Sequence, residues 1–575
     1  MPLRPPTTGM TDGRSTNRSR IFTASGSIPS KGIDSRCERH SETSPIKMDA
    51  QKFVEQKSLA MEESNTLDDE ALLARLGYKQ EFKRDFSGIE LFGLFFTING
   101  VVQTIAAVLL FSIPYGGPVA MVWGWFTCCC FIIIGSLAMA ELGSAAPTAG
   151  GLYYWTFMFS SPKYRKIVCW LVGYINTAAY IAGMAGVDWS VATQIMAAAN
   201  IGTNGAFVAT NAQVYGVYCA LLVIHAFMAS LATKVIARLQ HFFAFLNLAL
   251  FLVVIIALPV ATPKEFHNSA AFAFGRFINT SGWGNGFAFI LSFLAPAWTI
   301  GGYDTVVHIS EEAHNASRTV PFAMISGTVL ISVLGWIVNI VLALYIGNDL
   351  DSIIGNPIGQ PMATIFFNSF GKAGTLAIWA FIIITLWMSG MDFLIAGSRQ
   401  VFAFSRDQAL PLSGWLYNIN PQTKTPVHAV VFLAVMAIVL GLLSFAGPQA
   451  ISAVFTMLIA CQYICFTTPI IARWVGGQKF VPGPFNLGLL SAPVSFIASA
   501  YMIFIIVVFM FPAIPGPTSH SMNYTVVVVG GTVILSLGYY FFPKYGGRYW
   551  FTGPVGTIRQ VLTHEGEKDS GSSEG

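Results

Sequence analysis

Twelve apolar segments, each long enough to cross a lipid bilayer, follow one another along most of this chain. A membrane-spanning helix needs about 20 apolar residues and must satisfy its backbone groups without water, so such a chain folds as a bundle of helices. Charged residues make up only 10% of the sequence, against about 25% in soluble domains, which excludes a soluble globular protein. The predicted spans are residues 89–113, 118–140, 165–198, 213–232, 236–260, 284–312, 321–346, 374–403, 427–445, 449–472, 487–511 and 523–542.

The basic residues between the spans predict how the chain is oriented in the membrane. With the N-terminus in the cytosol, the cytosolic loops hold eleven Lys and Arg residues and the outer loops hold three. Basic residues concentrate in cytosolic loops, so both ends of the chain are predicted to lie in the cytosol. Residues 1–66, rich in Ser, Thr and Arg, are predicted to be a disordered tail. Residues 67–545 form the predicted membrane domain, and residues 546–575 form a second cytosolic tail.

Two adjacent glycines interrupt the sixth predicted span. Gly301 and Gly302 follow the apolar run that ends at Ile300, and they precede Tyr303 and Asp304. Glycine loosens a helix, and non-helical backbone at membrane depth is tolerated only where it is buried in protein or lines a cavity. The freed N–H and C=O groups form binding sites in transporters with discontinuous helices. The sequence therefore predicts a carrier of a small polar solute.

The first predicted span carries a second interruption. Asn99 and Gly100 form a turn signal within a run that is otherwise apolar. The two interruptions lie five spans apart, which is typical of a five-plus-five inverted repeat with discontinuous helices 1 and 6. The predicted fold class is therefore an all-α integral membrane protein of twelve helices, with two additional spans after the repeat. Close helix packing is the alternative explanation for either glycine site taken alone.

The two breaks suit a substrate that carries both an amine and an acid. A half-helix beginning near Val101 presents free N–H groups and a positive dipole end, which favours a carboxylate. Carbonyl groups released around Trp298, Thr299 and Ile300 favour an ammonium group. The candidate substrate-binding residues are Thr97, Ile98, Asn99, Gly100, Val101, Asp188, Trp298, Thr299, Ile300, Gly301, Gly302, Tyr303 and Asp304.

Two aspartates within the spans have alternative interpretations. A charge at the bilayer centre costs about 2.5–3.5 kcal/mol on insertion scales, which makes such residues functional candidates. Asp188, in the third span, is either an amine partner or proton carrier, or a partner in a helix-packing hydrogen bond. Asp304 follows the glycine pair directly, so it either caps the restarting helix or contacts substrate.

A group of charged residues near the cytosolic end of span six predicts an inner gate. Glu311 and Glu312 are adjacent, so on a helix their side chains point about 100° apart. One of them is expected to pair with Arg399 or Arg406 at the cytosolic end of span eight. His308 lies on the same helical face as the two glutamates. A histidine there either couples proton flux or is a structural residue with satisfied hydrogen bonds.

Four sequence blocks resemble the amino acid–polyamine–organocation superfamily of permeases, and within it the fungal GABA permeases of the amino acid/choline transporter group. The resemblance extends over residues 67–545, and its blocks are Leu72–Arg84, Met139–Glu141 with Pro147–Trp155, Pro296–Gly301 with Ser310–Ala313, and Ser398–Asp407. It implies the five-plus-five fold, with substrate held between spans one, three, six and eight. It also implies secondary transport, usually driven by a proton gradient.

The chain departs from this family pattern at two positions. Some proton-coupled relatives carry a lysine midway along span five, where this sequence offers Asn247. Coupling through that lysine is therefore excluded, so coupling is carried elsewhere or is absent. Asp392, in span eight, also departs from the pattern and is a candidate pocket residue. The candidate coupling and gate residues are Glu141, Asn247, His308, Glu311, Glu312, Arg399 and Arg406.

The predicted function is secondary active transport of GABA or related small amino acids, with a proton as the coupling ion. Membrane lipid is the expected surrounding, in the plasma or the vacuolar membrane. Choline and polyamines are alternative substrates. Choline favours an aromatic box around its quaternary ammonium group, and the presence of Trp298 and Tyr303 does not decide between choline and an amino acid. A nutrient-sensing receptor on a transporter fold is a further alternative, although such a receptor usually needs a long signalling tail.

A membrane-embedded enzyme is the third class of function considered. It needs converging nucleophilic or metal-binding side chains within the spans. The histidines in or near the spans, His225, His241 and His308, are too scattered along the sequence for a nucleophilic triad or a zinc site. The sequence therefore predicts no enzyme, and neither a cofactor, a metal nor a nucleic acid is expected as a partner.

Overall fold

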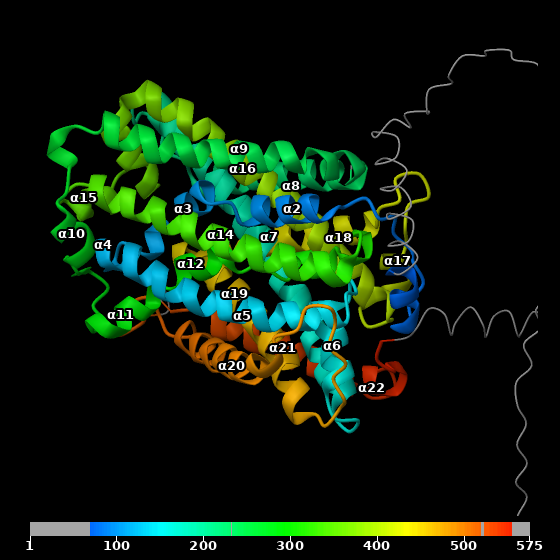
Figure 1. Ribbon diagram of the computed structural model, residues 1–575. Helices are drawn as coiled ribbons and strands as arrows, with labels where there is room; N and C mark the ends of the chain where they lie inside the picture. The colour runs from blue at the N-terminus through cyan, green and yellow to red at the C-terminus, as the bar shows by residue number, and fades with distance from the viewer. Residues whose placement is uncertain (1–68, 232, 519–521, 555–575) are drawn as a thin grey trace, which may run out of the picture. The chain divides into compact units, whose positions relative to one another are not determined.

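The computed structural model describes residues 69–231, 233–518 and 522–554 (Figure 1). The predicted tail at residues 1–66 lies outside the described residues, as does most of the tail predicted at 546–575. Within the described residues the secondary structure is helical, apart from one pair of two-residue strands and an isolated bridge between Phe86 and Ala313. The strands β1 (Tyr115–Gly116) and β2 (Ile278–Asn279) pair in antiparallel register.

The first half of the membrane domain contains the helices that surround the first break. They are α2 (Gly88–Asn99), α3 (Val102–Val108), η1 (Leu109–Phe111), α4 (Gly117–Val119), η2 (Ala120–Gly124), α5 (Trp125–Ala145), α6 (Gly151–Phe159), α7 (Arg165–Gly202), α8 (Asn211–Leu231), α9 (Thr233–Ala261), η3 (Lys264–Phe266) and α10 (Ala270–Gly275).

The second half begins with the helices of span six and continues to the C-terminal spans. They are α11 (Asn285–Leu291), α12 (Leu294–Ile300), α13 (Thr305–His308), η4 (Ser310–Glu312), α14 (Ala316–Tyr345), α15 (Leu350–Ile354), α16 (Pro361–Arg406), α17 (Ser413–Leu416), α18 (Val427–Gly441), η5 (Leu442–Ala446), α19 (Pro448–Val475), η6 (Gly488–Leu490), α20 (Ser491–Val508), α21 (Thr525–Phe541) and α22 (Gly547–Trp550).

Within the described residues, eleven helical segments are long and apolar enough to cross a membrane. They correspond to the first eleven predicted spans, which confirms the expectation of an all-helical, multi-pass membrane protein. The predicted segment at 523–542 corresponds to α21, an apolar helix of 17 residues that is shorter than the others. One boundary differs clearly, because α16 begins at Pro361 rather than at 374. Gly371, with φ of 65°, kinks this 46-residue helix near the predicted start.

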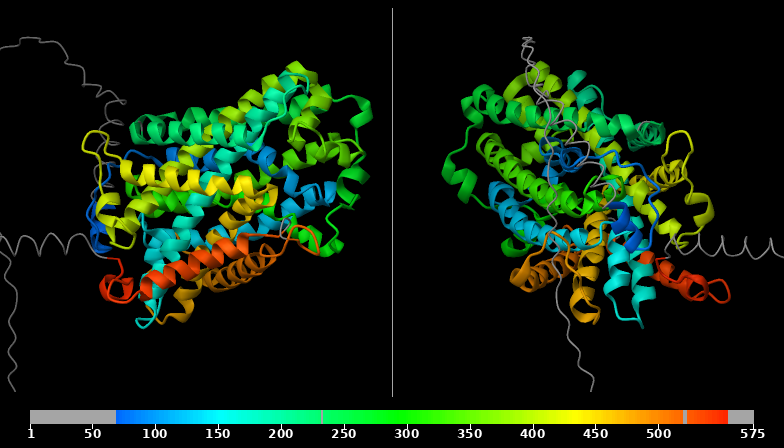
Figure 2. Two further views of the ribbon diagram at one scale, coloured as in Figure 1. Left: turned by 180° about the vertical axis from the view of Figure 1, so that it is seen from behind. Right: turned by 45° about the vertical axis from the view of Figure 1, so that its right-hand side comes forward.

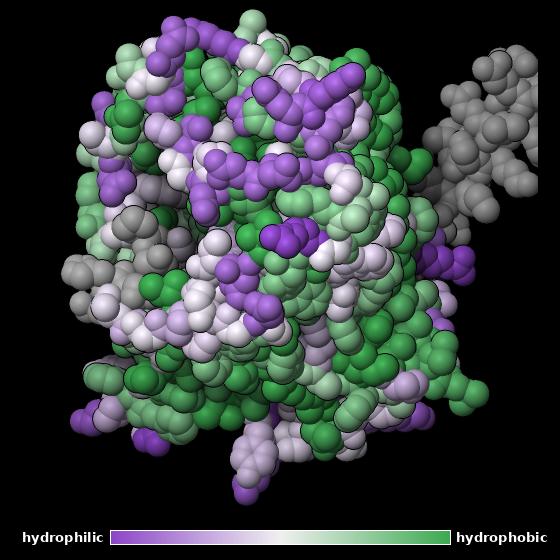
Figure 3. Space-filling view, turned by 90° about the vertical axis from the view of Figure 1, so that its left-hand side faces the viewer, coloured by the Kyte–Doolittle hydropathy of each residue, from purple (hydrophilic) through white to green (hydrophobic). Residues whose placement is uncertain are grey.

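Helix α7 packs against α16 and α19, and α14 packs against α5. Figure 2 shows α20 and α21 along one side of the bundle, away from α8 and α9. Large apolar side chains such as Phe227, Phe245 and Val260 are exposed on α8 and α9, as expected for lipid-facing helices. Figure 3 looks on the end of the bundle near α10 and α15, where hydrophilic residues gather.

The first span begins at a capping box that fixes where the helix enters the bundle. The Ser87 hydroxyl accepts a hydrogen bond from the Glu90 amide at 3.3 Å, and the Glu90 carboxylate accepts one from the Ser87 amide at 2.7 Å. Two amides at the helix end are thereby satisfied. Beyond the first turn, the residues of α2 from Phe95 to Asn99 are buried, so the helix leads directly into the break at Gly100.

Candidate functional site

The first break has a backbone conformation that requires glycine. Helix α2 ends at Asn99, and Gly100 has φ of 40°, in the left-handed region. A Cβ atom at Gly100 would also meet the Gln103 amide nitrogen at 1.6 Å. Helix α3 restarts at Val102 without a side-chain cap, which leaves its first amides without partners inside the helix. The Ser389 hydroxyl of α16 donates to the Ile98 carbonyl, so span eight closes directly on this break.

The second break is a turn between α12 and α13 that covers residues 301–304. A Cβ atom at Gly301 would lie 2.6 Å from the Ala297 carbonyl oxygen and 2.9 Å from Oε1 of Gln462 on α19. One at Gly302 would lie 3.5 Å from Oδ1 of Asn99. The two breaks therefore face each other. A Cβ atom at Gly301 would require its neighbours to shift, whereas one at Gly302 would make only ordinary contacts.

The interpretation of Asp304 as a helix cap is wrong. Its side chain makes no capping hydrogen bond to α13. Instead, one carboxylate oxygen accepts a hydrogen bond from the Tyr180 hydroxyl of α7 at 3.1 Å and lies 3.5 Å from Nε2 of His308. The hydroxyl of Thr305 satisfies the turn by donating to the Gly302 carbonyl at 2.6 Å. The second carboxylate oxygen of Asp304 is buried without a partner among the described residues.

Six buried polar groups near the two breaks have an atom without a hydrogen-bond partner among the described residues. Buried polar groups are normally hydrogen-bonded, so a cluster of exceptions marks a place where a ligand or water binds. The atoms are Thr97 Oγ1, Trp298 Nε1, Thr299 Oγ1, Tyr303 Oη, Asp304 Oδ1 and Gln462 Oε1. They comprise two groups that act only as acceptors, one that acts only as a donor, and three hydroxyls that can do both.

Both aromatic candidates pack on rings of α19, and each also reaches a second helix. The indole of Trp298 lies 3.7 Å from where a Cβ atom at Gly186 of α7 would be, and its ring centroid is 5.3 Å from that of Phe455. Tyr303 stacks on Phe466 of α19 with a centroid distance of 4.6 Å, and its hydroxyl is directed toward Gly135 of α5. Beyond α19, Trp298 lies against α7 and the Tyr303 hydroxyl lies against α5.

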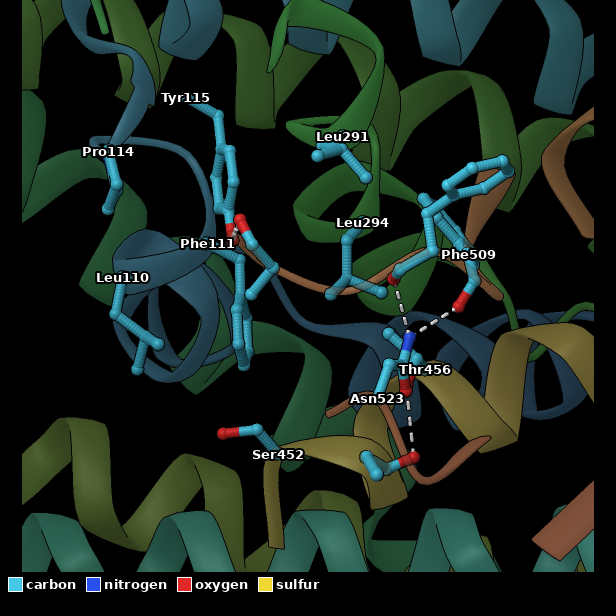
Figure 4. Close-up of a pocket in the computed structure, with 13 residues that line it drawn as sticks. Leu110, Phe111, Pro114, Tyr115, Leu291, Leu294, Ser452, Thr456, Phe509 and Asn523 are labelled. Carbon is cyan, nitrogen blue, oxygen red and sulfur yellow. Dashed lines mark hydrogen bonds between the residues drawn. The ribbon is translucent and has the colours of Figure 1, made fainter. Parts of the chain in front are cut away.

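A cavity of about 170 Å³ lies beyond the break on the side predicted to face outward. Figure 4 shows its walls, including Asn523, whose amide donates to the carbonyls of Phe509 and Phe511. Burial raises the pKa of Tyr115, at the rim, to about 12, so its hydroxyl stays neutral. Phe455 separates the cavity from Trp298, because its ring lies 5.4 Å from that of Phe111, which lines the cavity.

Two buried ion pairs lie on the other side of the break, near the predicted cytosolic end of span six. Arg406 donates to both carboxylate oxygens of Glu311, at 2.9 and 3.0 Å, and Arg399 donates to Glu312 at 2.6 Å. The predicted pairing with a span-eight arginine is confirmed, and both glutamates take part in it because η4 replaces the expected regular helix. The role of these pairs as a gate stays a prediction.

The environment of Glu311 keeps it ionised. Burial alone would raise the pKa of this carboxyl group, but the charge and hydrogen bonds of Arg406 outweigh it, and the pKa is lowered. The Ala149 amide also donates to Glu311 at 2.9 Å. This bond ties the loop after span two to the end of span six.

The remaining coupling and gate candidates form separate contacts. Glu141 pairs with Arg473 at 2.7 Å and accepts from the Ser491 hydroxyl at 2.6 Å, so it joins span two to the last spans rather than to the break. Asn247 accepts from the Gln103 amide at 2.6 Å, just inside the first break. His308 contacts the Ala149 carbonyl at 2.6 Å through Nδ1.

Asp188 lies in a contact between spans three and four, and Asp392 lies in a contact between spans eight and five. Asp188 of α7 contacts Nδ1 of His225 on α8 at 3.0 Å, and both side chains are fully buried. Asp392 accepts from the Gln240 amide of α9 at 2.8 Å. Neither aspartate has a contact with the residues of the two breaks among the described hydrogen bonds and ion pairs.

The sequence interpretation missed three polar residues at the breaks. They are Gln462, Ser389 and Tyr180, which come from spans ten, eight and three. A polar residue in an apolar span is a signal that could have identified Gln462, which stands between Cys461 and Tyr463. Ser and Tyr are common in membrane helices, so the other two carry no comparable signal.

Comparison with known proteins finds relatives that match this chain over most of its length. A family described as amino acid permease matches residues 89–533. The GABA-specific permease of Saccharomyces cerevisiae is 37% identical over 86% of this chain and 86% of its own length. An uncharacterised amino-acid permease of Schizosaccharomyces pombe is 37% identical over 86% of this chain and 89% of its own length. Amino-acid permease 2 of Neurospora crassa is 33% identical over 86% of this chain and 90% of its own length.

The family match covers most of the chain, and the eleven apolar helices of the described residues fit a multi-pass membrane protein. The expectation of a transporter rather than an enzyme is confirmed, because the family and these relatives are permeases. The chain belongs to the amino acid permease family and is a multi-pass membrane transporter of amino acids.

Proposed function

We propose that this permease carries GABA or a related small amino acid together with a proton, and that it binds its substrate between the two facing breaks. In this proposal α21 is the twelfth span, and spans one and six are the discontinuous helices of a five-plus-five inverted repeat. The position of α20 and α21 along one side of the bundle supports two spans added after the repeat (Figure 2). The GABA-specific name of one relative supports the choice of substrate.

The observation that carries the proposal is the cluster of unpartnered polar atoms at the breaks. Asp304 offers a buried carboxylate oxygen to a substrate ammonium group, and Gln462 offers an amide oxygen close to Gly301. The uncapped start of α3 and the unpartnered Thr97 hydroxyl offer donors to a substrate carboxylate. Donors at the first break and acceptors at the second break fit a zwitterion, because each end of the substrate then satisfies buried groups that otherwise have no hydrogen-bond partner.

The rival substrates fit this arrangement less well. A choline head group favours several aromatic faces around one point, whereas Trp298 and Tyr303 are already packed on rings of α19 and otherwise lie against α7 and α5, respectively. A polyamine carries a positive charge at each end and no acid. Asp304 is the one carboxylate at the breaks within the described residues. A receptor on the same fold would bind an amino acid without accumulating it.

Uptake of labelled GABA, alanine, putrescine and choline into cells that lack their own permeases tests the proposal. We expect saturable GABA uptake that unlabelled alanine reduces and that choline and putrescine leave unchanged. Uptake by whole cells would assign the protein to the plasma membrane, whereas uptake only by isolated vacuoles would assign it to the vacuolar membrane. Saturable uptake of choline or putrescine alone would contradict the proposal, as would GABA binding without uptake in either preparation.

A further inference from the structure

A histidine and an aspartate form an isolated pair in the interior of the membrane domain. His225 of α8 and Asp188 of α7 lie 3.0 Å apart, and the side chains of both are 0% exposed. Among the described residues His225 is the one ion-pairing partner of Asp188. The second ring nitrogen of His225, Nε2, is buried without a hydrogen-bond partner among those residues.

The charge of this pair depends on one proton. When the histidine is neutral and the aspartate ionised, the pair carries a net charge of −1 in a site without water contact. One added proton makes the pair neutral, and the unpartnered Nε2 atom of the histidine ring is the atom that binds this proton. A net charge is costly in the interior of a membrane protein, and the added proton removes the net charge of the pair.

Among the described residues no Lys or Arg side chain pairs with Asp188, and the two arginines of the neighbouring α16, Arg399 and Arg406, are paired with Glu312 and Glu311. On α8, Tyr218 faces Asp188 and donates its hydroxyl to the Ala437 carbonyl of α18. On α16, Asp392 is bonded to Gln240 of α9. The titratable residue of α18, His428, is bonded to the Trp415 carbonyl at the start of its helix. The groups that face the pair are therefore neutral or acidic.

The pair is linked to the first break through two consecutive residues of α16. A Cβ atom at Gly390 would lie 2.9 Å from Cε1 of His225 and 3.1 Å from Oδ1 of Asp188, so this turn of α16 packs tightly on the pair. The preceding residue, Ser389, donates its hydroxyl to the Ile98 carbonyl at the break. A change in the charge or geometry of the pair therefore acts on the same turn of α16 that closes the substrate site.

We propose that the Asp188–His225 pair is the proton-binding site that couples the proton gradient to amino acid transport. The inference rests on the proposed function, since it presumes a proton-coupled carrier. The pair takes up one proton from the outer side, which changes its net charge from −1 to 0, and releases it to the cytosol. A zwitterionic substrate is neutral overall, so each turnover moves one positive charge inward. The proton gradient drives transport because the two conformations of the carrier, open to one side or to the other, bind the proton with different affinities.

Gradient-driven uptake by the purified full-length protein in liposomes tests this site. With the lumen one pH unit more alkaline and the membrane potential clamped at zero, one proton per substrate gives about tenfold accumulation of GABA. We expect wild type to reach this ratio and His225→Gln to stay near one. The variant should still exchange labelled for unlabelled GABA across the membrane, because the substrate site is intact. His241→Gln, which changes an exposed histidine, is the matched control and should accumulate like wild type.

Several outcomes would overturn the proton site while leaving amino acid transport in place. One is full accumulation by His225→Gln. Another is loss of accumulation in Asp392→Asn or His308→Gln but not in His225→Gln, which would move the site to those residues. Exchange without accumulation by wild type would contradict proton coupling itself, and the proton site with it. Absence of both exchange and accumulation for every amino acid would contradict the proposed substrate.

A spectroscopic measurement tests the proton site without transport. The His225 ring lies 5.1 Å from the ring of Trp387, and an imidazolium ion quenches indole fluorescence more strongly than a neutral imidazole does. We expect a pH-dependent loss of fluorescence in wild type that is absent in His225→Gln and in Trp387→Phe. An identical pH profile in wild type and both variants would contradict a titrating His225.

Discussion

Replacing Gly301 with alanine is expected to reduce amino acid uptake by about 100-fold, because misplacement of a binding group by about 1 Å has effects of that size. The added Cβ atom would lie 2.6 Å from the Ala297 carbonyl oxygen and 2.9 Å from the Gln462 side chain. The carbonyl belongs to the backbone of the same span, so the turn itself must move. Initial rates of uptake at equal surface expression measure the effect.

A glycine in the same span provides the matched control for this substitution. Gly286, in α11, is exposed, and a Cβ atom there would meet nothing within 4 Å. Gly286→Ala should therefore transport at the wild-type rate and raise helix propensity slightly. Equal rates for Gly301→Ala and wild type would show that the second break tolerates a side chain. Equal losses in both variants would show a general effect on span six.

Neutralising Glu311 is expected to destabilise the folded protein by about 3–5 kcal/mol, the usual effect of removing one partner of a buried ion pair. Glu311→Gln keeps the shape of the side chain but leaves the charge of Arg406 buried without its partner. The double variant with Arg406→Gln removes both charges and should recover part of the loss. Thermal unfolding of the purified protein in detergent measures the difference.

The surface pair between Lys83 and Asp85 is the control for this prediction. Lys83 is 66% exposed, and its contact with Asp85 is 3.4 Å long. Exposed ion pairs contribute about 0–1 kcal/mol, so Asp85→Asn should leave the unfolding temperature nearly unchanged. Equal unfolding temperatures for Glu311→Gln and wild type would contradict a stabilising inner pair.

The pH dependence of stability follows from the lowered pKa of Glu311. The pKa is lowered in the folded protein relative to its ordinary value of 4.5. The carboxylate therefore stabilises the fold at pH values above 4.5, and this contribution is lost as the pH falls through the folded-state pKa. Acidification below pH 4.5 should lower the unfolding temperature of wild type more than that of Glu311→Gln.

The sequence predicted the features that depend on local chemistry. Apolar length located the spans, since the hydrophobic thickness of a bilayer sets how many residues a helix needs. The breaks at Gly100 and Gly301 could be predicted because glycine is a local turn signal whatever it packs against. Opposite charges at the cytosolic ends of spans six and eight predicted that one of Glu311 and Glu312 pairs with an arginine, and both glutamates do so.

Contacts set by the packing of distant helices could not be predicted in this way. Asp304 was expected to cap a helix because it precedes one, but a hydroxyl of α7 competes for its carboxylate. Ser389 and Gln462 reach the breaks only because α16 and α19 pack beside them. Asp188 and His225 lie 37 positions apart on two different helices, so no local pattern connects them.

The location of the substrate between the two breaks is the central claim, and a ligand-bound structure tests it most directly. A cryo-EM map of the purified protein with saturating GABA, compared with a map without it, measures where the added density lies. We predict density between the first break at Ile98–Val101 and the turn at Gly301–Asp304, within hydrogen-bonding distance of the Asp304 carboxylate. Density confined to the outer cavity beside Phe455, with no density at the breaks, would contradict the claim.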